Sequence, residues 1–283
     1  MISRFKYFKP HNLSDAVQYL EKEDKTYVLA GGTDLMILLR RNLINAEHIV
    51  DIKAVPELSV FEYVDGKGLT IGAGVVVNRV VDSEVVVAKY PALQQGAASL
   101  ASFQLRNRAT VVGNICNASP GADLPPSLLV YDAVVNIAGP QGSRQVPLHE
   151  FFTGVKRTVL QRGELVVSVQ LPEPGKDDRS IYLRQARLRG HDLATVGVAS
   201  RIKPDGKVAI GICAVAPTPL RLFALEEKIN ERGLSKETIA WAAEEINEHI
   251  HPISDVRSSA IYRLQMASVL LKRGLLELIG EEA

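Results

Sequence analysis

The amino-acid sequence predicts an α+β protein, and three features carry the prediction. Near the start of the chain, short strand and helix signals alternate around a glycine turn at Gly31-Gly32. A polar run rich in proline and glycine, residues 172–178, has the composition of a linker. Beyond it, strand signals on both sides of Asp205-Gly206 are followed by helical sequence as far as the C-terminus. Strands and helices are therefore expected in two groups, one on each side of the linker.

The length of the chain agrees with this division. Its 283 residues correspond to about two domains at roughly 150 residues each. We expect one domain over residues 1–177, made of two α/β subdomains at about 1–55 and 56–177, and a second domain over residues 178–283.

The composition is that of an ordinary globular protein, and it narrows the choice of partners. The formal net charge of +1 gives no reason to expect nucleic acid or an acidic membrane surface as a partner. No window approaches the ~18 apolar residues of a membrane span. The polar N-terminus lacks the apolar run of a signal peptide. We therefore expect a cytoplasmic protein without a membrane span.

The cysteines exclude one class of site. Only two occur, Cys116 and Cys213, and two thiols cannot supply a four-cysteine zinc site or iron–sulfur cluster. A disulfide between them stays open, but reduced and buried thiols are favoured in a cytoplasmic chain. No metal site is predicted.

The first fifty residues are expected to form a small α/β unit, with the glycine turn between its second strand and its second helix. Ser14 is a suitable N-cap for the first helix, and Thr33 or Asp34 for the second. The expected elements are strand 5–8, helix 12–23, strand 27–30, helix 35–41 and strand 48–52.

The remaining elements follow from the same kind of signal. The expected order is strand 69–75, helical sequence up to residue 105, helix 127–131, strand 133–138, strand 165–171, and strands 181–189, 195–202 and 207–214. The last helix carries one apolar stripe at steps of three and four residues: Ala260, Leu264, Ala267, Leu271, Leu275 and Leu278.

The first glycine motif, residues 30–35 (AGGTDL), has the pattern of an anion-binding turn. A strand that runs through glycines into a helix leaves several backbone N–H groups free at the start of the helix, where the dipole also favours an anion. Glycine lets the backbone approach a phosphate closely and adopt positive φ. A plain strand-to-helix turn explains this motif equally well when it is taken alone.

A second motif, residues 108–115 (RATVVGNI), lies downstream and is expected to be a loop. The Thr110 hydroxyl and the Gly113 N–H could donate to an anion, and Asn114 supplies both a donor and an acceptor. Asp123, stiffened by neighbouring prolines, could accept from a ribose hydroxyl. The alternative for Asp123 is a local cap of the helix that follows. Together the two motifs are suited to hold a pyrophosphate between two backbone segments, which points to a flavin dinucleotide.

Other chemistry is disfavoured. Residues 72–77 supply two glycines of a Rossmann fingerprint but lack the third. No nucleophile elbow, His-Glu-x-x-His motif or Walker loop occurs. His191 beside Asp192 is the only histidine in a suggestive setting, and a solvated loop residue is the favoured interpretation. We predict no catalytic acid–base residue.

At this point the sequence resembles a known family, the FAD-binding subunits of the xanthine dehydrogenase and carbon monoxide dehydrogenase family. The combination of residues 30–35 with 110–115 carries the resemblance, which covers essentially the whole chain. It is strengthened by residues 118–120, Asp123, Leu124 and Pro126 and, toward the C-terminus, by residues 184–195, 255–257 and 262–263.

The resemblance implies a fold and a cofactor. It implies a bipartite PCMH-type FAD-binding domain, like that of the vanillyl-alcohol oxidase group, followed by a three-stranded antiparallel sheet with a helical bundle. FAD is the implied cofactor, and its implied contacts are Ala30, Gly31, Gly32, Thr33, Asp34, Leu35, Thr110, Gly113, Asn114, Asn117, Asp123, Leu165, Val166 and Arg184.

The implied roles differ along this set. Residues 30–35 would bind the pyrophosphate, Asp123 the ribose, and Leu165 or Val166 would lie near the adenine or flavin ring. Arg184 stands where relatives often have lysine; it could favour a negatively charged reduced flavin or serve only as a surface charge. Val112 occupies a position where the family usually has glycine, and its branched side chain restricts the backbone there.

The resemblance also implies partners. The chain would be the electron-transfer subunit of an oxidoreductase complex, a molybdenum hydroxylase, with a molybdopterin-containing large subunit and a small subunit that carries 2Fe–2S clusters, as a heterotrimer or a dimer of heterotrimers. The alternative is a stand-alone FAD-dependent oxidase or dehydrogenase of the vanillyl-alcohol oxidase-like fold. The substrate, the electron acceptor and the direction of electron flow stay open.

Overall fold

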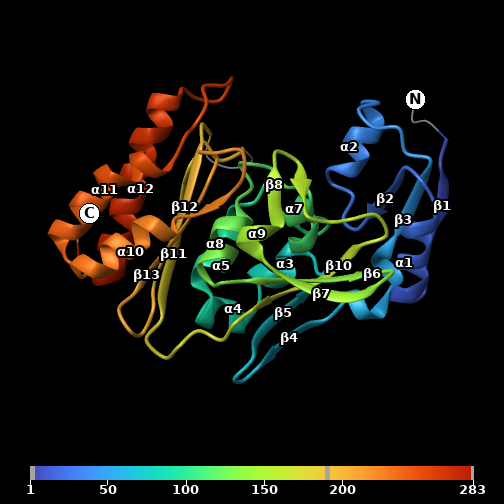
Figure 1. The fold of residues 1–283 in the computed structure, drawn as a ribbon, viewed down its shortest axis with the longest axis horizontal. Coiled ribbons are helices and arrows are strands. Elements are labelled where there is room, and N and C mark those ends of the chain that lie inside the picture. Colours follow the sequence, from blue (N-terminus) through green and yellow to red (C-terminus); the bar gives the residue numbers. More distant parts are fainter. Residues whose placement is uncertain (1–3, 189–191, 282–283) are drawn as a thin grey trace.

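The computed structural model describes residues 4–188 and 192–281. Figure 1 shows a parallel sheet at the N-terminal end, an antiparallel sheet with helices in the centre, and a second antiparallel sheet covered by the C-terminal helices. This arrangement is the predicted α+β class. No helix in the described part of the chain is long and apolar enough to cross a membrane.

The N-terminal unit is a parallel sheet with the strand order β1-β3-β2. Its elements are β1 (Lys6–Phe8), α1 (Leu13–Lys22), β2 (Thr26–Leu29), α2 (Leu35–Arg40) and β3 (His48–Asp51). The N-cap of α1 is Asn12 and not Ser14, because the Asn12 side chain accepts from the Asp15 N–H at 2.8 Å. The carboxyl end of β2 leads directly into Gly31-Gly32, so the first motif lies at the edge where parallel sheets usually bind ligands.

The central sheet has the strand order β4-β5-β10-β6-β7, and all of its neighbours are antiparallel. Its strands are β4 (Phe61–Val64), β5 (Gly68–Gly72), β6 (Val134–Gly139), β7 (Gly142–Pro147) and β10 (Leu165–Leu171). The helices are α3 (Val77–Val81), α4 (Glu84–Lys89), α5 (Pro91–Ser99), α6 (Phe103–Arg106), α7 (Val111–Cys116), α8 (Leu124–Val130) and α9 (Leu148–Phe151), and β8 (Phe152–Gly154) with β9 (Arg157–Thr158) forms a small hairpin.

The third group consists of an antiparallel sheet, β11-β12-β13-β14, and three α-helices. Beyond the three predicted strands, a two-residue strand, β14, extends the sheet. The elements are β11 (Arg179–Gln185), β12 (Val196–Ile202), β13 (Val208–Cys213), β14 (Leu220–Arg221), α10 (Phe223–Arg232), α11 (Lys236–Glu245) and α12 (Ala260–Ile279). The predicted turn joins β12 and β13, with Gly206 at φ 81°.

The C-terminal sheet is covered on both faces. Helix α12 packs on β11 and β12, while α5 and α8 of the preceding part pack against β11, β12 and β13. Every residue of β12 and β13 is therefore buried. The second motif, which precedes α8, is thus supported by the C-terminal sheet as well as by its own core.

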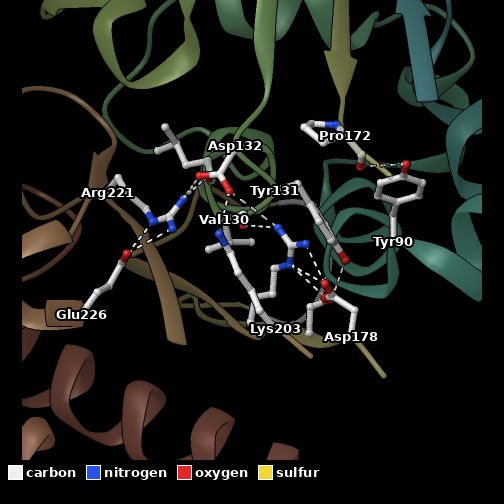
Figure 2. A network of polar contacts seen from close by, with 12 residues as sticks. Tyr90, Val130, Tyr131, Asp132, Pro172, Asp178, Lys203, Arg221 and Glu226 are labelled. Carbon is white, nitrogen blue, oxygen red and sulfur yellow. Dashed lines mark hydrogen bonds and ion pairs between the residues drawn. The ribbon is translucent and has the colours of Figure 1, made fainter. Parts of the chain in front are cut away.

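Several polar contacts between α8 and this sheet lie at the C-terminal end of the helix (Figure 2). The Arg201 guanidinium donates to the Val130 carbonyl at 2.9 Å and to the Asp178 carboxylate at 2.6 Å. Arg221 donates to the Leu129 carbonyl and to Asp132. Arg201 thus gives a partner to the Val130 carbonyl at the helix end, where carbonyl groups lack intrahelical partners. The Leu129 carbonyl accepts from Arg221 in addition to the Asp132 N–H.

We expect Arg201→Met to destabilise the protein by about 3–5 kcal/mol, because it leaves the buried Asp178 carboxylate without its cation. The side chains of Arg201 and Asp178 are only 7% and 4% exposed. Lys203→Met is the matched control, because the Lys203–Asp132 pair is partly open to solvent and such pairs contribute about 0–1 kcal/mol. Urea unfolding measures the free energy of unfolding of both variants. An equal loss of stability in the two variants would contradict the larger contribution assigned to the buried Arg201–Asp178 pair.

Candidate functional site: two glycine motifs in contact

The two sequence motifs meet at Gly31. A Cβ atom at this position would lie 2.0 Å from the carbonyl oxygen of Arg108 and 3.0 Å from the Cα of Ala109. Only glycine allows such a close approach of two backbones. The structure therefore brings together segments that are far apart in the sequence, as the two-motif prediction requires.

The first motif offers unused backbone donors. The Met36 N–H donates to the Gly32 carbonyl at 3.0 Å. The five N–H groups before it, those of residues 31–35, donate to no acceptor within the described residues. Gly32 has φ 75°, a conformation that favours glycine. Consecutive free N–H groups in such a turn form a concave donor surface that suits an anion.

The predicted side-chain caps of α2 do not form. Asp34 occupies the N-cap position without a capping hydrogen bond, and Thr33 makes none either. Instead, Asp34 Oδ1 accepts from Asn117 Nδ2 at 2.9 Å. This bond joins the first motif to the end of the second, because Asn117 is the C-cap residue of α7.

The second motif was expected to be a loop, and this expectation was wrong. Residues Val111–Cys116 form α7, and Thr110 is its N-cap. The Thr110 hydroxyl accepts from the Gly113 N–H at 3.0 Å, so this N–H is used within the protein. A Cβ at Gly113 would lie 2.7 Å from the same hydroxyl, which explains why glycine is needed here.

The side chains of Asn114 and Val112 lie in different surroundings. The Asn114 Oδ1 atom is buried and has no hydrogen-bond partner within the described residues. Such an atom is costly unless a ligand or water donates to it. Val112 is 3% exposed and belongs to the main hydrophobic core.

Asp123 lies in a buried polar cluster with two residues of β11. Its Oδ1 accepts from the Tyr182 hydroxyl at 2.9 Å and from Arg184 Nη1 at 3.3 Å. It makes no capping hydrogen bond to α8, so the alternative role as a local cap is excluded. Burial raises the pKa of Asp123, although Arg184 and Tyr182 oppose the shift. Arg184, with a side chain 14% exposed, is not a simple surface charge.

The other predicted residues are accounted for less directly. Leu165 and Val166 begin β10 and are buried in the main core. α7 packs on β10. His191 lies outside the described residues. Both cysteines are free, Cys213 buried and Cys116 partly exposed. The described part of the chain contains no cluster of His, Cys, Asp and Glu residues that could hold a metal.

Tyr182 was missed by the sequence analysis, although a signal for it was present. It stands two residues before Arg184 in a predicted strand, and residues at this spacing share one face of a strand. The aromatic hydroxyl and the guanidinium both reach Asp123 for this reason.

These features fit FAD. Free N–H groups at residues 31–35 are suited to a pyrophosphate, and the unpartnered Asn114 oxygen is suited to a hydroxyl of the ribityl chain or ribose. Residues 3–174 match the family described as "FAD binding domain in molybdopterin dehydrogenase", and residues 181–278 match "CO dehydrogenase flavoprotein C-terminal domain".

The chain belongs to this family of FAD-binding subunits. It is 30% identical over 281 residues to the xanthine dehydrogenase FAD-binding subunit of Escherichia coli O157:H7, covering 97% of this chain and 96% of the relative. It is 32% identical to the carbon monoxide dehydrogenase medium chain of Hydrogenophaga pseudoflava, covering 96% of each.

Solved structures agree with this assignment. A carbon monoxide dehydrogenase chain from Hydrogenophaga pseudoflava superimposes with a TM-score of 0.94 at 31% identity and covers 100% of both chains. A chain of quinoline 2-oxidoreductase from Pseudomonas putida 86 gives 0.91 at 28% identity and again covers 100% of both. The FAD-binding subunit thus has the predicted PCMH-type domain, its cofactor is FAD, and its relatives are subunits of oxidoreductase complexes.

We expect Gly31→Ala to abolish or strongly weaken FAD binding, because the added methyl group forces the two motifs apart. Gly66→Ala is the control: its Cβ would meet nothing within 4 Å, although φ is 77° there. It should lower stability by about 1 kcal/mol and leave FAD binding intact. Flavin fluorescence titration tests both variants. Normal FAD affinity in Gly31→Ala would refute the tight-contact explanation.

Asp123→Asn should change how stability depends on pH. Because the folded-state pKa of Asp123 is raised above 3.8, folding favours its protonated form, and the wild type loses relative stability as the pH rises through this window. The Asn variant keeps an acceptor for Tyr182 but does not titrate. Its stability relative to the wild type should therefore increase as the pH rises from about 4. Thermal melts of the two FAD-free proteins over this pH range measure the stability difference. A difference that decreases as the pH rises would show that the Arg184 charge outweighs burial and lowers the pKa of Asp123.

Proposed function

We propose that this chain is the electron-transfer subunit of a molybdenum hydroxylase-type complex. In the proposed complex it works with a molybdopterin-containing large subunit and a small subunit that carries 2Fe–2S clusters, as a heterotrimer or a dimer of heterotrimers. Bound FAD supplies one- and two-electron chemistry, so it can connect one-electron clusters to an external acceptor. The cytoplasmic location expected from the sequence stays a prediction.

One observation carries this proposal: the two glycine motifs meet and offer unused donors and an acceptor suited to a dinucleotide. The unused donors of residues 31–35 and the Asn114 oxygen suit a dinucleotide. The two free cysteines cannot ligate iron–sulfur clusters, so these would have to belong to another chain. The protein's part is to bind and orient FAD and to set its electrostatic environment.

The stand-alone oxidase is the alternative function. It requires a substrate pocket with a general base beside the flavin, and the only histidine with a suggestive sequence setting, His191, lies outside the described residues. Co-purification separates the two. Recovery with a molybdenum-containing and an iron–sulfur-containing chain supports the complex, whereas substrate oxidation by the isolated FAD-loaded chain would refute it.

Arg184 provides a test of electrostatic tuning. We propose that its guanidinium, held by Asp123, makes the reduction potential of bound FAD more positive, because a fixed cation stabilises the additional negative charge. Arg184→Met should lower the two-electron potential by about 20–30 mV, which corresponds to ~1 kcal/mol. Arg184→Lys should restore most of it. Spectroelectrochemical titration measures the potential, and an unchanged value in Arg184→Met would exclude this role.

A further inference from the structure

The tip of the β8–β9 hairpin lies against the second motif, although neither glycine motif includes it. The Lys156 N–H donates to the Ala118 carbonyl at 3.0 Å, just after α7. Both residues have left-handed backbone, with φ 58° at Lys156 and 44° at Ala118. Non-glycine residues adopt this conformation only when the surroundings hold them there. The hairpin tip is thus fixed beside the FAD motifs.

Lys156 is an exposed residue, and its ammonium lies within electrostatic range of Asp34 in the first motif. Partial desolvation lowers the pKa of Lys156, and the Asp34 charge opposes that shift. Asp34 is in turn bonded to Asn117, one residue before Ala118. Across residues 4–188 and 192–281, no carboxylate lies within 4 Å of the Lys156 ammonium.

The backbone donors of the first motif do not by themselves compensate the charge of a pyrophosphate. The five free N–H groups are neutral, and Asp34 adds a negative charge where a pyrophosphate would bring more. The nearby Lys53 is paired with Asp51 at 2.8 Å. A dinucleotide held by residues 31–35 therefore needs compensation for its charge, and ammonium groups are common phosphate ligands.

We propose that Lys156 binds the pyrophosphate of FAD, as a contact from outside both glycine motifs. The inference rests on the placement of FAD at these motifs. Bound pyrophosphate would replace Asp34 as the main electrostatic partner of the ammonium. The hydrogen bond to Ala118 positions the residue for this role.

Flavins that differ in their phosphates test the proposal. In the full-length chain, Lys156→Met should weaken FAD binding about tenfold, equivalent to ~1.4 kcal/mol, and should leave the affinity for riboflavin, which has no phosphate, unchanged. Lys156→Arg should retain most of the FAD affinity. Lys67→Met, in the turn between β4 and β5, removes the same charge elsewhere and should bind FAD like the wild type.

The readouts are fluorescence titration and thermal melting of the FAD-free variants, so none depends on turnover. Wild-type FAD affinity in Lys156→Met overturns the proposal, as does an equal loss for FAD and riboflavin, which would mean a general loosening of the pocket. If the wild-type chain itself binds no FAD, the placement of the site fails first, and this outcome is distinct from a failure of Lys156 alone.

Discussion

Helix α8 is held at both ends by side chains of the C-terminal sheet, and these contacts support the second glycine motif, which precedes the helix. At its N-terminal end, Asp123 accepts from Tyr182 and Arg184. At the other end, Arg201 and Arg221 donate to its last carbonyl groups. All seven residues of the helix are buried. Because a short connection joins α7 of the second motif to α8, the C-terminal sheet helps to position that motif.

The first motif has separate support and reaches the second by two contacts. It belongs to the N-terminal α/β unit, in which Leu39 of α2, Ala46 and Ile49 of β3 form a small core. Gly31 packs on the Arg108 backbone, and Asp34 accepts from Asn117. The N-terminal unit also contributes Ala16, Leu20, Val50 and Ile52 to the main core. The proposed FAD site is therefore assembled from segments that share this core, and one backbone contact and one side-chain hydrogen bond join the two motifs directly.

The sequence predicted local features of the fold and site better than distant ones. The glycine turn, the Asp205-Gly206 hairpin and the stripe of α12 each depend on short-range geometry, and all three are present. The loop expected at the second motif is a helix because Thr110 caps it, a local signal that was available but was interpreted as an anion donor. The hairpin β8–β9 was not expected, since its short strands show no clear alternation.

The long-range pairings of the site are not specified by local sequence patterns. Asp123 could be recognised as a polar residue among prolines, but its pairing with Arg184 depends on how β11 packs beside α8. The same is true of Asp34 and Asn117, which are 83 residues apart and bond only because Gly31 lets the motifs touch. Partners of this kind are decided by tertiary packing, which a single sequence does not encode in any local pattern.

Val112 shows how the site tolerates a departure from the family pattern. A branched residue in place of glycine would harm the site if the backbone at this position had to approach FAD closely. In this protein residue 112 lies inside α7, and its side chain fills the main core at 3% exposure. The close approach occurs one residue later, where a Cβ at Gly113 would lie 2.7 Å from the Thr110 hydroxyl. Of the two positions that are usually glycine in the family, residue 113 must stay glycine because of the helix cap. Residue 112 can carry an apolar side chain that is buried in the core.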